Sequence, residues 1–191
     1  MKTTIYTLLL TASLTFIEGN AQKMQVMETS NFTTSFEVSQ TPEQVFNAVT
    51  DVRNWWSEEV KGNTSKQGDM FSYQYKDVHK TKIKLVEVVP NKKIVWEVVE
   101  NDFSFTKDKS EWVGNRIVFE ITPKRNKTEL KFTQIGLVPA YECYEICSTA
   151  WTNFINVSLK NLIEKGNGAP NPEGKDNEFN EQNLRDHNIA R

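Results

Sequence analysis

Few residues in this sequence have the chemistry that catalysis requires. Nucleophilic catalysis needs a base beside a Ser, Cys or Thr, and the chain has only two histidines. His79 stands beside Asp77 in the segment KDVHK, where we expect a surface turn between two strands, and His187 lies near the C-terminus. Among the charged residues, only Glu97 is a candidate acid–base group. The sequence therefore predicts no catalytic centre.

The two cysteines, Cys143 and Cys147, are four residues apart. On a helix they share one face, where side chains rarely reach disulfide geometry. With two histidines in the chain they form no zinc-ligand spacing, and we expect them to pack as small apolar side chains. Phosphate-loop, dinucleotide-binding and EF-hand patterns are absent from the sequence as well. We therefore predict neither a metal nor a cofactor.

Aromatic side chains remain as candidates for a binding site, because small-molecule pockets are lined by such residues with a few polar groups among them. The residues expected to line a pocket are Trp55, Trp56, Tyr73, Tyr75, Trp96, Phe119, Phe132, Gln134, Trp151 and Phe154. Polar groups that could orient a ligand are Tyr73, Tyr75, Glu97, Gln134 and Asn153. The alternative is that the aromatic residues fill an ordinary core. Whether these polar groups face inward depends on strand register, since a slip of one residue reverses the face of a side chain.

A long helix must position the last of these residues. Over residues 142–165, apolar or small side chains recur with the i, i+3, i+4, i+7 spacing of one buried face. No Gly or Pro interrupts the segment, and Gly166 follows Lys165 as a C-terminal cap. We expect Ala150, Trp151, Phe154, Ser158 and Leu162 to face a sheet across a cavity, with the cysteines at its entrance.

Alternating apolar residues predict six strands, at residues 31–39, 69–76, 81–89, 93–100, 116–122 and 128–135. After the first strand, Thr41 is placed to cap a short helix, with Pro42 at its first position and Gln44 as the capping-box partner. A second short helix from Asp51 carries the adjacent tryptophans Trp55 and Trp56. Because neighbouring helical residues diverge by about 100°, we expect one to enter the core and the other to face a groove or solvent.

The order of elements is strand, two short helices, five strands and one long helix. Runs of strands without βαβ alternation indicate an antiparallel α+β domain. The long helix alone can cover the inner face, so we expect a curved six-stranded sheet wrapped around it, with a cavity between.

Composition limits the partners of this 191-residue chain. Its formal net charge is −2, from 23 basic and 25 acidic residues, which argues against binding to nucleic acid. Residues 1–21 resemble a short secretory signal, too short for a membrane span. The alternative is an extension on a cytoplasmic protein, with Met24 or Met27 as the start. Residues 22–30 form a linker, residues 31–165 the domain, and residues 166–191, rich in Gly, Pro, Asn and charge, are expected to be disordered.

Two motifs carry a resemblance to a known family. The segment TPEQVFNAVTD, Thr41 to Asp51, followed by Trp55-Trp56, is similar to a motif of the family named for the C-terminal domain of the activator of Hsp90 ATPase. The run Gly136-Leu137-Val138-Pro139 into the long helix also resembles that family. The resemblance covers about residues 31–165. It implies the helix-grip fold of the START and Bet v 1 (SRPBCC) superfamily, whose members include ligand carriers, stress-related proteins and co-chaperone-like proteins.

Three functions follow as expectations. The first is non-enzymatic binding of a small hydrophobic or amphipathic ligand between the long helix and the sheet. The second is a co-chaperone-like or stress-related interaction module, with a chaperone or other protein partner meeting the surface at Trp55 and Trp56. The third, implied by cyclases of the same superfamily, is an enzyme acting on a small carbonyl substrate, and it would need Glu97 inside the cavity.

Overall fold

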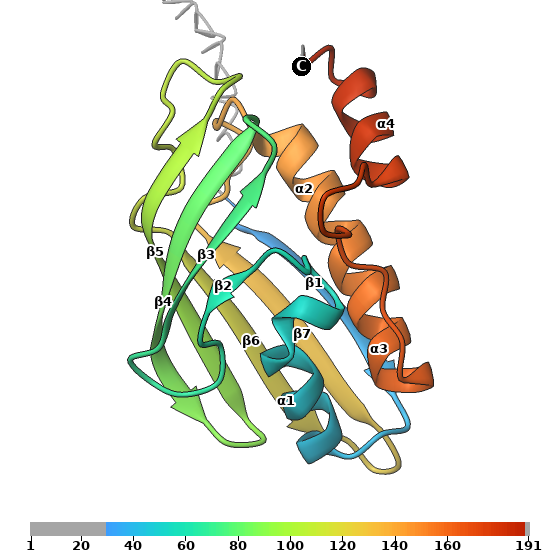
Figure 1. The fold of residues 1–191 in the computed structure, drawn as a ribbon. Coiled ribbons are helices and arrows are strands. Elements are labelled where there is room, and N and C mark those ends of the chain that lie inside the picture. The colour runs from blue at the N-terminus through green and yellow to red at the C-terminus, as the bar shows by residue number, and fades with distance from the viewer. Residues whose placement is uncertain (1–29, 190–191) are drawn as a thin grey trace, which may run out of the picture.

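A curved antiparallel sheet faces one long helix in the computed structural model, which describes residues 30–189 (Figure 1). This is the α+β architecture expected from the order of elements. The expected signal peptide and nearly all of the linker lie outside the described residues.

The sheet has seven strands in the order β1-β7-β6-β5-β4-β3-β2. They are β1 (Phe32–Val38), β2 (Lys61–Gly62), β3 (Met70–Tyr75), β4 (His79–Val89), β5 (Lys93–Phe103), β6 (Arg116–Pro123) and β7 (Thr128–Ile135). The six expected strands are present, and β2 is an addition to them. It lies before the second expected strand, and its Gly62 pairs with Phe71 at a φ of 115°. A Cβ at Gly62 would overlap the carbonyl oxygen of Met70, so only glycine lets the two strands approach.

The first helix, α1 (Pro42–Thr50), begins with the expected capping box. The backbone N–H of Gln44 donates to Thr41 Oγ1 at 3.2 Å, and the backbone N–H of Thr41 donates to Gln44 Oε1 at 2.9 Å. The second helix is a single 3₁₀ turn, η1 (Val52–Asn54). It delivers both tryptophans inward: Trp55 is 0% and Trp56 2% exposed. The alternative that one of them faces solvent is wrong, because the chain turns after Asn54 and both rings enter the interior.

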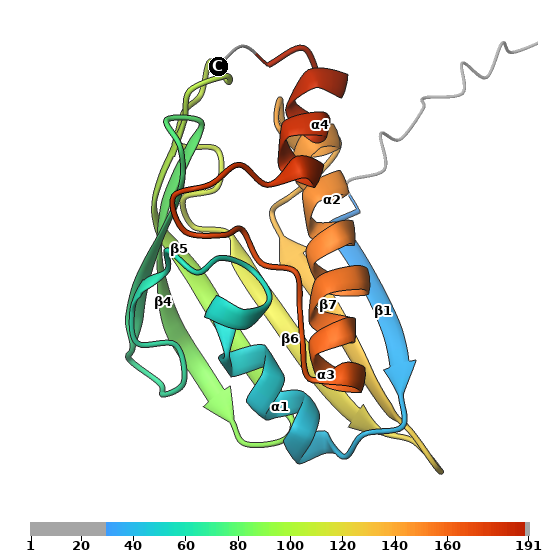
Figure 2. The same cartoon turned by 45° about the vertical axis from the view of Figure 1, so that its right-hand side comes forward.

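The long helix lies across the concave side of the sheet (Figure 2). It consists of α2 (Tyr144–Asn153), a π-helical segment η2 (Phe154–Leu159) and α3 (Lys160–Lys165), and Gly166 ends it in a left-handed conformation with φ 78°. Wide π turns are rare and often mark functional regions. Ser158 in this segment donates from Oγ to the carbonyl oxygen of Trp55 at 2.7 Å, which joins the helix to η1.

The chain after Gly166 is ordered, and the expectation of disorder is wrong for residues 166–189. It crosses the opening between sheet and helix and forms α4 (Glu178–Asp186) beside α2 (Figure 2). Asn177 caps α4 by accepting the backbone N–H of Asn180 at 3.0 Å. The segment has few apolar residues, which led to the expectation of disorder. It is ordered because its polar groups find partners on the folded domain: the N–H of Asn171 donates to Trp56 O, and Ala169 N–H to Ser158 Oγ.

Gly168 gives a test of how tightly this segment is fixed. A Cβ there would overlap the carbonyl oxygen of Asn54 and lie 3.1 Å from Ser158 Oγ. We predict that Gly168→Ala destabilises the attachment of residues 166–189 by about 1–3 kcal/mol and speeds proteolytic cleavage there. The control is Asn167→Ala at the exposed neighbouring position. Equal cleavage rates for the two variants would contradict the close approach.

Candidate functional site

A small cavity of about 70 Å³ lies between the long helix, the end of the sheet at β3–β5, and α4. Aromatic rings dominate its walls. The sheet side and adjoining loops contribute Trp56, Tyr73, Tyr75, Val78, His79, Phe103, Phe105 and Trp112. The helical side contributes Ile146, Cys147, Ala150, Trp151, Phe154, Asn180, Asn183 and Leu184.

The predicted site residues divide into two groups. Those that line the cavity are Trp56, Tyr73, Tyr75, Trp151 and Phe154. Those that lie in the core beside it, and do not line it, are Trp55, Trp96, Phe119, Phe132 and Gln134. The sequence pattern does not separate wall from core, because the boundary depends on where helix and sheet diverge.

The core group supports the wall group through ring contacts. Trp55 and Trp96 stack with centroids 6.2 Å apart, and the edge of Phe119 meets Trp96 at 4.8 Å. Above them, Trp56 stacks on Tyr73 at 4.4 Å and contacts Trp151 at 5.1 Å. Because aromatic pairs in these geometries are favourable beyond their burial, the rings of the cavity wall are held in fixed orientations.

Gln134 holds the Trp151 ring in place by hydrogen bonds. Its Oε1 accepts the indole N–H of Trp151 at 2.6 Å, and its Nε2 donates to Asn115 Oδ1 at 3.0 Å. The oxygen and the nitrogen of this buried amide each have a hydrogen-bond partner. Gln134 therefore orients the wall residue Trp151 and does not itself line the cavity.

His79 lies at the cavity, and the expectation of a surface turn is wrong for it. It is the first residue of β4, and its ring lies 4.4 Å from Phe103, 4.9 Å from Trp112 and 5.3 Å from Tyr73. Burial among these rings lowers the pKa of His79 to about 3, against a smaller opposing effect of its hydrogen bond to Asn101. The signal was available in the sequence, since His79 continues backward the alternation of Thr81, Ile83 and Leu85.

Both cysteines are buried and free. Cys143 Sγ accepts the indole N–H of Trp112 at 3.2 Å. Cys147 lines the cavity, and burial, followed by the hydrogen bond with Cys143, raises the pKa of its thiol. A thiol held protonated is a weak nucleophile, so Cys147 contributes shape to the cavity wall.

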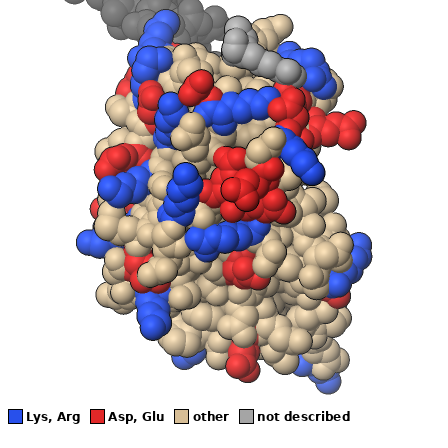
Figure 3. Space-filling view, in the orientation of Figure 1, with Lys and Arg blue, Asp and Glu red and all other residues tan. Residues whose placement is uncertain are grey.

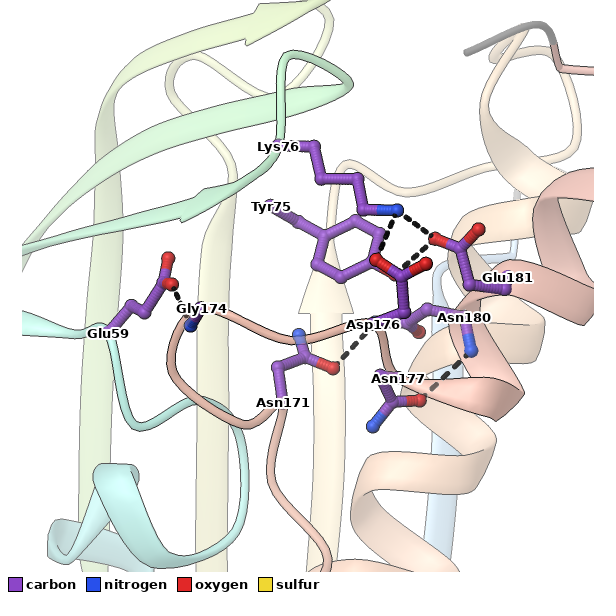
Figure 4. Close-up of polar contacts among 9 residues, drawn as sticks. All are labelled: Glu59, Tyr75, Lys76, Asn171, Gly174, Asp176, Asn177, Asn180 and Glu181. Atoms are coloured by element: carbon purple, nitrogen blue, oxygen red, sulfur yellow. Dashed lines mark hydrogen bonds and ion pairs between the residues drawn. The ribbon is translucent and has the colours of Figure 1, made fainter.

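Polar side chains from the chain after Gly166 bond the two tyrosines of the cavity wall, and the polar edge that Asn171, Asn180 and Glu181 form there is called the mouth of the cavity (Figure 4). Asn171 Nδ2 donates to Tyr73 OH at 3.0 Å, and Asn180 Nδ2 donates to Asn171 Oδ1 at 2.6 Å. Tyr75 OH donates to Glu181 Oε1 at 2.7 Å. Burial is the main reason why the pKa values of Tyr73 and Tyr75 lie well above the ordinary tyrosine range, so both hydroxyls stay protonated. Nothing in the sequence pattern of the tail predicted these partners.

Two other expected polar groups lie elsewhere. Glu97 is half-buried on the other face of the sheet, where its Oε2 lies 3.5 Å from Arg116. This position removes it as an acid–base group of the cavity. Asn153 lines a separate groove on the outer side of the long helix.

Charges of both signs are interspersed over the face seen in Figure 3, with an acidic group near its centre. Within residues 30–189, no three His, Cys, Asp or Glu side chains are grouped to hold a metal ion. Nor does this part of the chain contain a helix long and apolar enough to cross a membrane.

The imidazole of His79, enclosed by aromatic rings and only partly exposed, predicts a dependence of stability on pH. Its pKa in the folded protein, about 3, lies below the unfolded value of about 6.5, so the unfolded chain binds the proton more tightly. This contribution to stability is present above about pH 6.5 and is lost as the pH falls toward 3. In His79→Gln, the urea midpoint should change less between pH 7 and pH 4 than in the parent. An unchanged pH profile would contradict the burial of a neutral imidazole.

Comparison with known proteins agrees with this architecture. The sequence model of the family described as "Activator of Hsp90 ATPase homolog 1-like protein" matches residues 39–164. The match ends before Gly166, so the segment that closes the cavity lies outside it. None of the curated proteins matches the chain significantly in sequence.

Several solved structures share the fold. The Aha1 dimer from Colwellia psychrerythraea has 22% identity and a TM-score of 0.59, and the match covers 73% of this chain and 99% of that one. The protein SSP2350 from Staphylococcus saprophyticus has 17% identity and a TM-score of 0.55, covering 73% and 95% of the two chains. CalU16 from Micromonospora echinospora has 13% identity and a TM-score of 0.52, covering 81% of each. With two thirds of its residues inside the family match, this chain belongs to the activator of Hsp90 ATPase homolog 1-like family, with the helix-grip fold expected from its motifs.

Proposed function

We propose that this chain binds a small hydrophobic or amphipathic ligand in the cavity between the long helix and the sheet. The observation that carries the proposal is the wall of oriented aromatic rings, Trp56, Tyr73 and Trp151 among them, beside a mouth built of polar groups. Pockets for small molecules combine an apolar lining with a few placed polar groups in this way.

The size of the cavity sets a condition on binding. At about 70 Å³ it is smaller than the roughly 300–1,000 Å³ of typical ligand pockets. The sheet and the long helix are held together by the aromatic core, whereas α4 and the chain before it are attached mainly by polar contacts. Entry of a ligand therefore requires α4 to move.

Binding is favoured over catalysis by the state of the reactive groups at the cavity. His79 stays neutral near pH 7 because its pKa is lowered to about 3, which makes it a poor base. The thiol of Cys147 stays protonated, since burial raises its pKa. Glu97 lies outside the cavity, and neither His79 nor Cys147 is a strong acid–base group in its place.

A chaperone-related partner is suggested by the family alone. The surface expected for it, at Trp55 and Trp56, is not exposed, because both rings are buried. Burial of this pair weakens the interaction-module alternative relative to ligand binding.

A larger side chain on the helical wall of the cavity tests this proposal. Ala150 lines it, whereas Thr149, the preceding residue of α2, is exposed and faces the outer groove. We predict that Ala150→Leu lowers the affinity for the dye N-phenyl-1-naphthylamine at least about tenfold, which corresponds to 1.4 kcal/mol, while Thr149→Leu leaves it unchanged. Dye fluorescence measures binding, and circular dichroism checks that both variants fold. Equal dye affinities of the two variants would mean that the dye binds outside the cavity. Absence of dye binding to the parent would count against the proposed ligand-binding function.

A further inference from the structure

Helix α4 carries two different groups on the face that packs against the cavity wall. Leu184 lines the cavity and is 4% exposed. Glu181, one turn earlier, is also only 4% exposed and lies at the mouth (Figure 4). The spacing of three residues puts both side chains on the same side of the helix. On this face, α4 therefore carries the alkyl side chain of Leu184 and, about one helical turn away, the carboxylate of Glu181.

Two donors of the domain, Tyr75 and Lys76, bind the Glu181 carboxylate. Tyr75 OH donates to Glu181 Oε1 at 2.7 Å, and Lys76 Nζ lies 2.6 Å from the same oxygen. Lys76 also pairs with Asp176 at 2.7 Å, and its pKa is raised by Asp176 first and by Glu181 second, so it stays cationic. A buried carboxylate is unfavourable unless it is paired and hydrogen-bonded. Tyr75 lines the aromatic cavity and Lys76 lines the groove next to it, so the two form an anion-receiving pair beside the cavity.

The backbone at this pair is unusual. Lys76 has a φ of 48°, in the left-handed region that few residues other than glycine adopt. The conformation turns the Lys76 ammonium toward α4, next to the Tyr75 hydroxyl (Figure 4). Strained residues persist where the surrounding structure holds them in place, and they cluster at binding sites.

Inside the cavity, α4 leaves one polar atom without a partner. Asn183 is 5% exposed and lines the cavity, and its Nδ2 donates to the carbonyl oxygen of Ile146 at 3.0 Å. Its Oδ1 is buried and accepts no hydrogen bond from residues 30–189. A buried acceptor without a donor weakens the packing of α4, which favours exchange of this helix for a better-fitting occupant.

We propose that α4 is an internal surrogate for the ligand, and that the external ligand is an amphipathic carboxylate, with an aromatic or alkyl body, that displaces it. This inference rests on the proposed function and names the ligand class for the same cavity. The ligand carboxylate takes the place of Glu181 on Tyr75 and Lys76, and its apolar body takes the place of Leu184. Because ligand and helix compete, the apparent dissociation constant equals the intrinsic one divided by the fraction of molecules in which α4 is displaced.

The first arm of the test compares two probes on the full chain. The anionic probe is 1-naphthaleneacetate and its neutral counterpart is 1-naphthaleneacetamide, which share the same aromatic body. Quenching of tryptophan fluorescence reports binding, since Trp56, Trp112 and Trp151 line the cavity. We expect the carboxylate to bind about tenfold more tightly than the amide. In Lys76→Met this preference should vanish, while the amide binds more tightly because α4 is loosened. The control is Lys82→Met, which removes a half-exposed lysine paired with Glu100 on the outside of the sheet, and it should keep the preference.

The second arm of the test weakens the attachment of α4 and leaves Tyr75 and Lys76 unchanged. Glu181→Gln removes the charge that α4 presents to Lys76, so 1-naphthaleneacetate should bind several-fold more tightly than to the parent. Glu178→Gln, an exposed position on the same helix, should match the parent. Weaker or unchanged binding of the carboxylate by Glu181→Gln would overturn the surrogate role of α4.

The outcomes separate this inference from the function on which it rests. Equal affinities of the parent for acid and amide, lowered together by Ala150→Leu, would overturn the ligand class and leave binding in the cavity standing. Absence of binding of both probes, and of the neutral dye, to the parent and to Glu181→Gln would overturn the proposed function together with the inference.

Discussion

The structure depends on the burial of one aromatic layer between the long helix and the concave face of the sheet. Trp55, Trp96 and Phe119 are fully buried and contact one another. Large rings of this kind give most of the apolar burial in a core, and their preferred edge and stacked geometries limit how helix and sheet can approach. On β6 and β7, Phe119 and Phe132 are fully buried and do not line the cavity. On β3–β5, the same kind of side chain lines it.

Two polar links transmit this packing to the segments that surround the cavity. Gln134 fixes the indole of Trp151, and Ser158 in the π-helical segment bonds both Trp55 O and Ala169 N–H. Ser158 thus joins the long helix, the turn after η1 and the start of the C-terminal segment at one hydroxyl. Because a buried hydroxyl is unfavourable without partners, its bonds tie the position of that segment to the position of the helix.

The C-terminal segment adds to the family fold a closure made largely of polar contacts. The family match ends at residue 164, and the chain beyond it supplies Asn171, Asn180 and Glu181 at the mouth of the cavity. Hydrogen bonds that exchange with water contribute little net stability each, about 1 kcal/mol, whereas the aromatic layer loses its packing if it opens. The part of the molecule that can open at low free energy is therefore the part that covers the cavity. This division is the one that the proposed binding of a ligand in the cavity requires.

The sequence by itself determined the elements: all six expected strands, the capping box of α1, the long helix and the inward faces of its aromatic residues. These features depend on local periodicity and on caps formed by residues three apart, such as Thr41 and Gln44. Only the tertiary structure decided which rings line the cavity, that His79 joins them, that Glu97 lies outside, and that the polar tail folds. Those outcomes depend on strand register, on sheet curvature and on partners about 100 residues apart, such as Tyr75 and Glu181. Periodicity predicts which face of an element is buried, but it does not determine which residues pack against that face.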